Sequence, residues 1–178
     1  MQMTTLDIEI AIIKGSHVRQ NLVVPNVSWG MVNNDGVLHE CDIIILTPSS
    51  YATEIEIKIS KGDLLQDMNK RHAHKHNLIR KFYYAVPEKL KQIALNVIPE
   101  RAGLYVVSEI EATNYKWFEG GGGIAIPYKY RRVIIVKEAL VNKDAIKWND
   151  KQRYQLARLG TMRILGLKQK IQKLSKCR

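Results

Sequence analysis

The order of apolar and polar residues along the chain predicts alternating helices and strands. Thr4 followed by Asp7 is the pattern of a capping box, which favours a helix over residues 5–14 that ends at Gly15. The segment 7–12 also alternates like a strand, and we adopt the helix. Beyond it, apolar runs bounded by turn residues predict strands at residues 21–24, 27–32, 41–47, 51–59, 82–86 and 102–108.

The remaining segments predict further helices and a looser second part. Helices are expected at residues 61–77 and 88–94 and from Asp144 onward. Gly160 and Gly166 are expected to interrupt or end the last of these. The glycine run at 120–123 predicts a flexible or functional loop, and residues 133–136 an edge strand. The pattern as a whole is that of an α/β protein.

Composition narrows the class of protein. With 178 residues, 46% hydrophobic and 25% charged, the chain is long enough to bury a sizeable core. It holds no apolar stretch of about 18 residues, so we expect no membrane association through a spanning helix. The first residues lack the pattern of a signal peptide, and Cys41 and Cys177 are too far apart to form a disulfide framework. A cytoplasmic location is therefore expected.

The charge is distributed unevenly. Residues 1–128 carry 13 basic and 14 acidic side chains, a net charge of −1, whereas residues 129–178 carry 15 basic and 3 acidic side chains, a net charge of +12. We therefore divide the chain into a core at 1–128 and a basic, largely helical extension at 129–178 that packs on the core. Such an asymmetry suggests an acidic polymer such as nucleic acid as partner; the alternatives are a basic surface that serves solubility alone and, less favoured, contact with an anionic membrane.

The candidate chemistry lies on two neighbouring predicted strands. Glu54, Glu56 and Lys58 project from one face of their strand, and the isoleucines between them project from the other face into a core. If residues 48–50 form a three-residue turn, the pairing places Asp42 directly opposite Glu56. A two-residue turn would shift the register by one and separate the two carboxylates.

Two carboxylates about 5 Å apart repel each other unless a cation lies between them, and oxygen ligands suit Mg²⁺ or Mn²⁺. Such a site hydrolyses phosphodiesters, because the metal lowers the pKa of a bound water and Lys58 would hold or activate that water. The alternative is a salt-bridged polar strand face in which Glu56 pairs with Lys58.

Four ordered motifs resemble a known group of proteins. Asp42, thirteen intervening residues and Glu56-Ile57-Lys58 resemble the signature of the PD-(D/E)XK nuclease superfamily. The motifs that follow resemble its MmcB-like DNA-repair proteins over about residues 5–108. They are Asp63-Leu64-Leu65-Gln66-Asp67, the strand Phe82–Pro87 and Ile98-Pro99-Glu100-Arg101-Ala102-Gly103-Leu104.

The resemblance implies a restriction-endonuclease-like core, which is a mixed central sheet flanked by helices, and metal-dependent cleavage of DNA. It implies metal ligation by Asp42, Glu56 and the backbone carbonyl of Ile57, with Glu9 completing the catalytic set; the alternative for Glu9 is an exposed helix residue. The chain departs from the family after the second helix Asp, where Met68-Asn69-Lys70-Arg71 replaces a Lys-Trp pair, and at Cys41, which replaces a proline.

Basic side chains outside the catalytic set are candidates for phosphate contacts, namely Lys61, Lys70, Arg71, Arg153, Arg158 and Arg163. His72, His74 and His76 fit a basic helix surface better than a zinc site, because no third soft ligand lies nearby. Trp117 and Phe118 either stack on bases or anchor the glycine loop.

The expected function is that of a Mg²⁺- or Mn²⁺-dependent DNA endonuclease. The alternative is a DNA-binding accessory protein with little catalysis. A homodimer is an open option.

Overall fold

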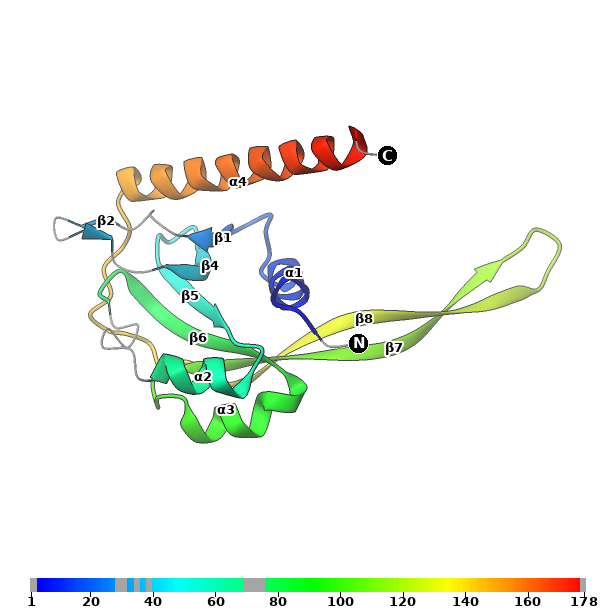
Figure 1. The fold of residues 1–178 in the computed structure, drawn as a ribbon, viewed down its shortest axis with the longest axis horizontal. Helices are drawn as coiled ribbons and strands as arrows, with labels where there is room; N and C mark the ends of the chain where they lie inside the picture. The colour runs from blue at the N-terminus through cyan, green and yellow to red at the C-terminus, as the bar shows by residue number, and fades with distance from the viewer. Residues whose placement is uncertain (1–2, 28–31, 34–35, 38–39, 69–75, 177–178) are drawn as a thin grey trace.

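The computed structural model describes residues 3–27, 32–33, 36–37, 40–68 and 76–176 (Figure 1). In chain order, its elements are α1 Thr5–Gly15, β1 Leu22–Val27, β2 Val32–Asn33, β3 Gly36–Val37, β4 Cys41–Leu46, β5 Ala52–Ile57, α2 Lys61–Met68, β6 Ile79–Pro87, the 3-10 turn η1 Glu88–Leu90, α3 Lys91–Val97, β7 Gly103–Trp117, β8 Gly123–Lys137 and α4 Asp150–Lys176.

Six strands form one mixed sheet in the order β1-β4-β5-β6-β7-β8, and β2 pairs with β3 separately. Strands β5, β6 and β7 run parallel to one another, while the pairs at both ends of the sheet are antiparallel. Each parallel connection contains a helix, as the geometry of a crossover requires. The chain is thus an α/β protein, as its sequence predicts.

Apolar side chains cover both faces of this sheet. One face packs against Ile8 and Ile12 of α1. The other packs against Leu64 of α2, Ala94 of α3 and the first turns of α4. Because both faces are buried, the central strands read as nearly continuous apolar runs in the sequence.

Several local predictions are confirmed. The Thr4 side chain accepts from the backbone of Asp7 and the Asp7 carboxylate accepts from the backbone of Thr4, which completes the capping box of α1. Strand β1 runs through Pro25 without the predicted break, and residues 28–31 of the second predicted strand lie outside the described residues. Since β1 lies at the edge of the sheet, a proline without an N–H can be accommodated there. The helix predicted over 61–77 ends at Met68 within the described residues, and His76 and Asn77 are not helical.

The second part of the chain differs most from the prediction. Strands β7 and β8 have 15 residues each, so the sheet continues across the predicted boundary between residues 128 and 129. The expected break at Gly160 and Gly166 is wrong, because α4 runs through both. A Cβ at Gly160 would lie 3.4 Å from a methyl of Val24, which is an ordinary van der Waals contact, so α4 packs on β1 here without requiring a glycine.

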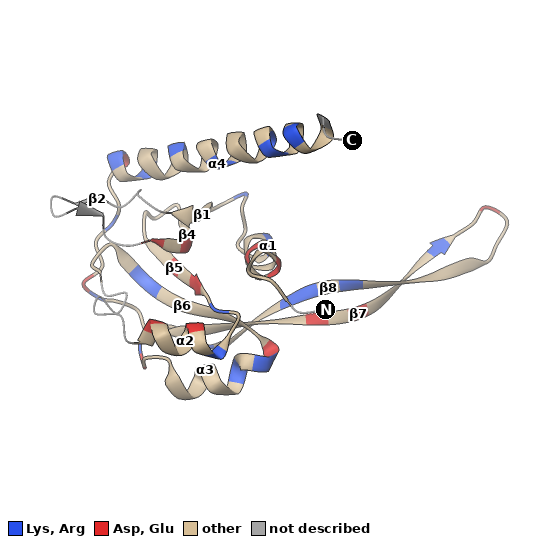
Figure 2. Cartoon of the chain, in the orientation of Figure 1, with Lys and Arg blue, Asp and Glu red and all other residues tan. Residues whose placement is uncertain are grey.

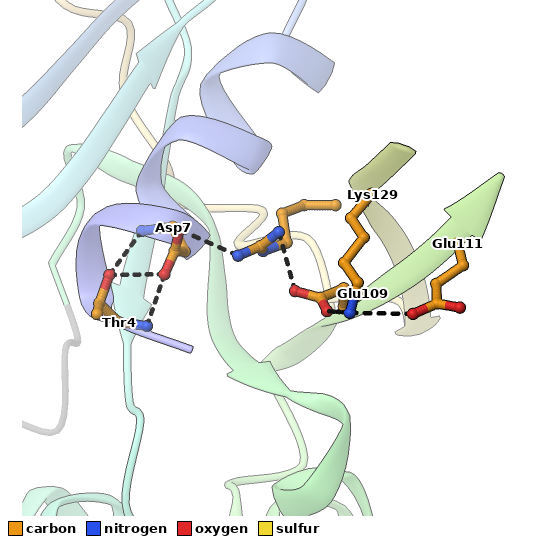
Figure 3. Close-up of polar contacts among 6 residues, drawn as sticks. Thr4, Asp7, Glu109, Glu111 and Lys129 are labelled. Atoms are coloured by element: carbon orange, nitrogen blue, oxygen red, sulfur yellow. Dashed lines mark hydrogen bonds and ion pairs between the residues drawn. The ribbon is translucent and has the colours of Figure 1, made fainter. Parts of the chain in front are cut away.

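Beyond Val107, β7 has no pairing with β6, and it continues with β8 alone as a two-stranded ribbon. We call residues 108–132 the arm. It projects from the body (Figure 1) and turns at Gly120, Gly121 and Gly122, whose φ angles of 107°, 90° and 92° favour glycine. A ladder of ion pairs joins its base to α1: Arg131 contacts Asp7 at 3.3 Å and Glu109 at 3.1 Å (Figure 3).

The segment between β8 and α4 fixes where the last helix starts. Trp148 is buried, and its indole N–H donates to the carbonyl of Leu78 at 2.8 Å. Asn149 and Gln152 then exchange side chain–backbone hydrogen bonds of 2.9 Å at the start of α4. None of the helices in the described part of the chain has the length and apolar character that crossing a bilayer requires.

Candidate functional site

The β4–β5 hairpin has the predicted register. Thr47 and Tyr51 close a three-residue turn, and Ile43 pairs with Ile55 and Ile44 with Glu54. Continuing this register places Asp42 opposite Glu56. The Asp42 carboxylate accepts a hydrogen bond of 2.7 Å from the backbone N–H of Ile57, so it is fixed against the end of β5.

Asp42 lines a cleft of about 680 Å³ that lies between α4 on one side and α1, β1 and β4 on the other. Glu9 of α1 and Asn26 of β1 contribute to one wall, and Arg163 and Lys170 of α4 contribute to the other. Glu40 also lines this cleft. Figure 2 shows acidic positions on α1, β4 and β5, and basic positions at intervals along α4. The cleft therefore combines carboxylates on the body with cations on the last helix.

Asn26 connects the two walls of this cleft. Its side-chain amide donates to the Glu9 carboxylate at 3.0 Å, and its backbone carbonyl accepts from the guanidinium of Arg163. Asn26 has a φ of 53°, a left-handed conformation that asparagine tolerates better than most residues. Partial burial raises the pKa of Glu9, the Asn26 hydrogen bond opposes that shift, and the nearby charge of Asp42 adds to it. Glu9 and Asp42 are thus neighbours in space.

Glu56 and Lys58 belong to a second, closed cluster. The Lys58 ammonium lies 2.8 Å from Glu56, 3.3 Å from Asp67 and 3.7 Å from Asp63. Tyr84 donates its hydroxyl to Asp67 at 2.7 Å. Lys58 is 5% exposed and Glu56 is 6% exposed. The face of β5 that carries the polar residues is therefore buried as deeply as the isoleucine face, because α2 covers it.

Burial alone lowers the pKa of Lys58, but the hydrogen bond to Glu56 and the charges of Glu56, Asp67 and Asp63 outweigh it, and the pKa rises above its ordinary value. Lys58 is consequently an ammonium at neutral pH. In this state it stabilises negative charge and cannot take a proton from water. The observed contact is therefore the salt bridge between Glu56 and Lys58 that the sequence suggests as the alternative to a metal site.

The donors for a divalent cation are only partly assembled. Within the described ranges, no three His, Cys, Asp or Glu side chains are grouped so that they could hold a metal ion. Asp42 and Glu56 are paired in register, and Ile57 lies between the two clusters. A cation here would fit only with few protein ligands and several waters, which is a coordination that Mg²⁺ accepts.

The predicted phosphate contacts are scattered over the molecule. Arg163 lies in the cleft, whereas Arg153 and Arg158 are exposed elsewhere on α4. Lys61 is the exposed first residue of α2. Lys70 and Arg71 lie outside the described residues, as do His72 and His74. Successive arginines on α4 are five positions apart, and five residues turn a helix by about 140°, so they point in different directions.

Other predictions have mixed outcomes. Cys41 is buried as expected, and burial raises the pKa of its thiol. His76 accepts the backbone N–H of Leu78 on its Nδ1 atom. Trp117 is 74% exposed, stacks on Tyr115 and lies against Gly123 at the end of the glycine turn, and stacking on bases stays a prediction.

Sequence reasoning missed Asn26 and Glu40 in the cleft and Asp67 in the closed cluster. Asp67 was identified only as part of a motif, because nothing in its sequence neighbourhood shows that it will meet Lys58. The only signal for Asn26 is that it follows a proline, and this favours a turn without assigning a partner.

Comparison with known proteins gives a fold and no activity. No family model matches the sequence, and the search of curated proteins found no significant match. A solved structure described as the SPO1766 protein of unknown function from Silicibacter pomeroyi matches with a TM-score of 0.58 at 14% identity. The match covers 98% of this chain and 96% of that one, so the arm and the last helix lie within the shared fold.

Proposed function

We propose that this protein binds DNA in the cleft beneath α4 and cleaves it with the help of Mg²⁺ or Mn²⁺, as the PD-(D/E)XK resemblance implies. The observation that carries the proposal is the cleft itself, in which Glu9 and Asp42 lie opposite Arg163 and Lys170. Carboxylates alone would repel a phosphate backbone. Cations on the opposite wall offset that repulsion and hold the backbone in place.

The order of elements supports a restriction-endonuclease-like core. Helix α1 is followed by the antiparallel strands β1, β4 and β5, then by α2 and by β6, which is parallel to β5. The candidate carboxylates lie on α1, β4 and β5, which is the placement that the resemblance implies. A mixed sheet with helices on both faces is consistent with it.

Residues of the cleft and of the adjoining closed cluster have defined parts in this proposal. Asp42, Glu56 and the carbonyl of Ile57 would hold the cation. When bound, the cation would polarise the scissile phosphate and lower the pKa of a bound water. Glu9, whose pKa is raised by burial and by Asp42, is suited to accept a proton from that water. Lys58 would contribute positive charge beneath the metal ligands.

The experiment is to incubate the full chain with duplex, single-stranded and branched DNA in the presence of Mn²⁺, Mg²⁺ or EDTA. We expect cleavage of at least one form with either cation and none with EDTA. Absence of cleavage of every form with both cations would overturn the nuclease proposal.

A second function, DNA binding without catalysis, is favoured by one observation: Glu56 is held by Lys58 at 2.8 Å inside a closed cluster. Such a carboxylate would have to exchange a buried ion pair for a metal contact. Salt-dependent DNA affinity that persists in EDTA, together with no cleavage, would support this accessory role.

A further inference from the structure

The arm has two chemically different faces. The register pairs Ile124 with Lys116, Ile126 with Asn114 and Tyr128 with Ala112. Because alternate residues of a strand share a face, one face carries a row of apolar side chains. We call this row the apolar face of the arm; it consists of Ile110, Ala112, Ile124, Ile126, Tyr128 and Tyr130.

The opposite face is polar at the base of the arm. Lys129 contacts Glu109 and Glu111 at 3.0 Å, and Arg131 continues this ladder to Asp7 of α1 (Figure 3). These contacts attach the arm to the body and leave the apolar face uninvolved. On the other face, the Ser108 hydroxyl at the base of the arm donates to the Glu88 carboxylate of η1 at 2.7 Å, and the apolar row beyond it takes no part in these contacts.

The apolar face is exposed to solvent. The exposed fractions are 56% for Ile124, 45% for Ile126, 48% for Tyr128 and 41% for Tyr130. Four large side chains at every second position of one strand form a continuous row. A sheet that is apolar on one face is stable when another layer covers it, and an isolated two-stranded ribbon is marginal in water.

We propose that a second copy of this chain covers this face, so that two arms pack face to face about a two-fold axis. Two-fold packing places the same patch against itself and needs no foreign partner. If the four exposed side chains Ile124, Ile126, Tyr128 and Tyr130 bury about 100 Å² each, they remove about 400 Å² per copy, and Asn114 and Lys116 of the same face add to this, against the roughly 800 Å² per partner of a standard interface.

Charge favours a second copy over DNA at this face. Lys116 and Arg132 lie on the same face as the apolar row, one near each end of the arm, and Glu111 and Glu109 pair with Lys129 on the other face. A surface that binds phosphates needs several cations. With the two arms antiparallel about an axis between Ile126 and Tyr128, Lys116 of one copy lies near Tyr130 of the other. An ammonium is attracted to an aromatic ring, and the two copies of Lys116 stay apart.

The proposal does not depend on the proposed DNA cleavage, and its test uses the full chain without DNA. Light scattering coupled to size exclusion should give a mass of twice 20.4 kDa at micromolar concentrations. The double variant Ile126→Thr/Tyr128→Thr keeps side chains that suit strands and removes most of the apolar contact. We expect it to raise the dissociation constant at least tenfold.

The matched control is Tyr115→Thr, which removes an aromatic side chain of similar exposure from the other face of the same ribbon. It should leave the dissociation constant unchanged within twofold. Ile124→Thr is a milder disruption, and circular dichroism checks that each variant is folded. A monomeric wild-type chain at 100 µM, or an equal effect of Tyr115→Thr and Tyr128→Thr, would overturn the proposal. So would a folded Ile126→Thr/Tyr128→Thr variant that keeps the dimer mass of the wild-type chain.

Discussion

Asp42 on β4 and Glu56 on β5 lie opposite each other in the hairpin, and they differ in what surrounds them. Asp42 faces an open cleft, together with Glu9 and cations from another helix. Glu56 is 6% exposed and is neutralised by Lys58 from its own strand. A carboxylate that keeps access to solvent can exchange its partner for a ligand. A carboxylate that is buried with its counter-ion stabilises a particular arrangement of the core.

We therefore expect substitutions in the closed cluster to act mainly on stability. Substitutions in the open cleft should act mainly on binding and catalysis. Asp42 connects the two, because its carboxylate accepts the backbone N–H of Ile57 between Glu56 and Lys58. If the protein is a nuclease, this hydrogen bond is the route by which the closed cluster positions the open one.

The largest effect is expected for Lys58→Met. Removing the ammonium leaves Glu56 and Asp67 buried without their shared counter-ion, which typically destabilises a protein by roughly 3–5 kcal/mol. Urea unfolding followed by circular dichroism measures the change. Lys61→Met on the exposed start of α2 is the control, and its effect should stay within about 0.5 kcal/mol. A change below about 1 kcal/mol in Lys58→Met would mean that the cluster is hydrated.

Asp42→Asn should act on catalysis. The amide removes a charge from the cation site and keeps most of the shape, so the single-turnover rate of DNA cleavage should fall by at least about 100-fold, or about 2.7 kcal/mol. DNA affinity should stay equal or become tighter, because a repelling charge is lost. Cleavage at the wild-type rate would show that Asp42 is not part of the catalytic site.

The cations of the cleft should determine salt dependence. Arg163→Gln/Lys170→Gln should weaken binding to all DNA sequences alike and reduce the slope of log affinity against log salt by about 1.8, since each phosphate contact contributes about 0.9. The control is Lys89→Gln/Lys91→Gln, which removes two cations from η1 and α3. Equal losses in the two double variants would place the DNA elsewhere on the molecule.

The smallest effect concerns the ladder at the base of the arm. Hydrogen bonds from the Thr4 backbone and hydroxyl lower the pKa of Asp7, and Arg131 adds to the shift. A lowered carboxyl pKa contributes stability that is present above the ordinary value near 3.8 and is lost as the pH falls through the folded-state value. Asp7→Asn should therefore lower the melting temperature slightly at pH 7 and have a smaller effect at pH 2. An equal effect at both pH values would show that the charge of Asp7 is not responsible.

Local rules were sufficient for the features that depend on neighbouring residues. The capping box of α1 follows from Thr4 and Asp7 alone. The pairing of Asp42 with Glu56 follows from a three-residue turn and the two-residue period of a strand, and both are properties of one hairpin. The resemblance to nuclease motifs adds an expectation about chemistry, which stays a prediction.

Only the tertiary structure decided which of these residues face solvent. The alternation around Glu56 indicates two faces, but whether the polar face is covered depends on α2, whose Asp67 meets Lys58 through the packing of a separate element. Glu9 and Arg163 are 154 positions apart in sequence, and they approach the same asparagine because α1 and α4 both pack beside β1. The alternation of Ile124, Ile126, Tyr128 and Tyr130 is a strand period that the sequence contains, but only the tertiary structure decides that β7 and β8 continue as an exposed ribbon, because β6 ends at Pro87 and no longer pairs with β7 beyond Val107.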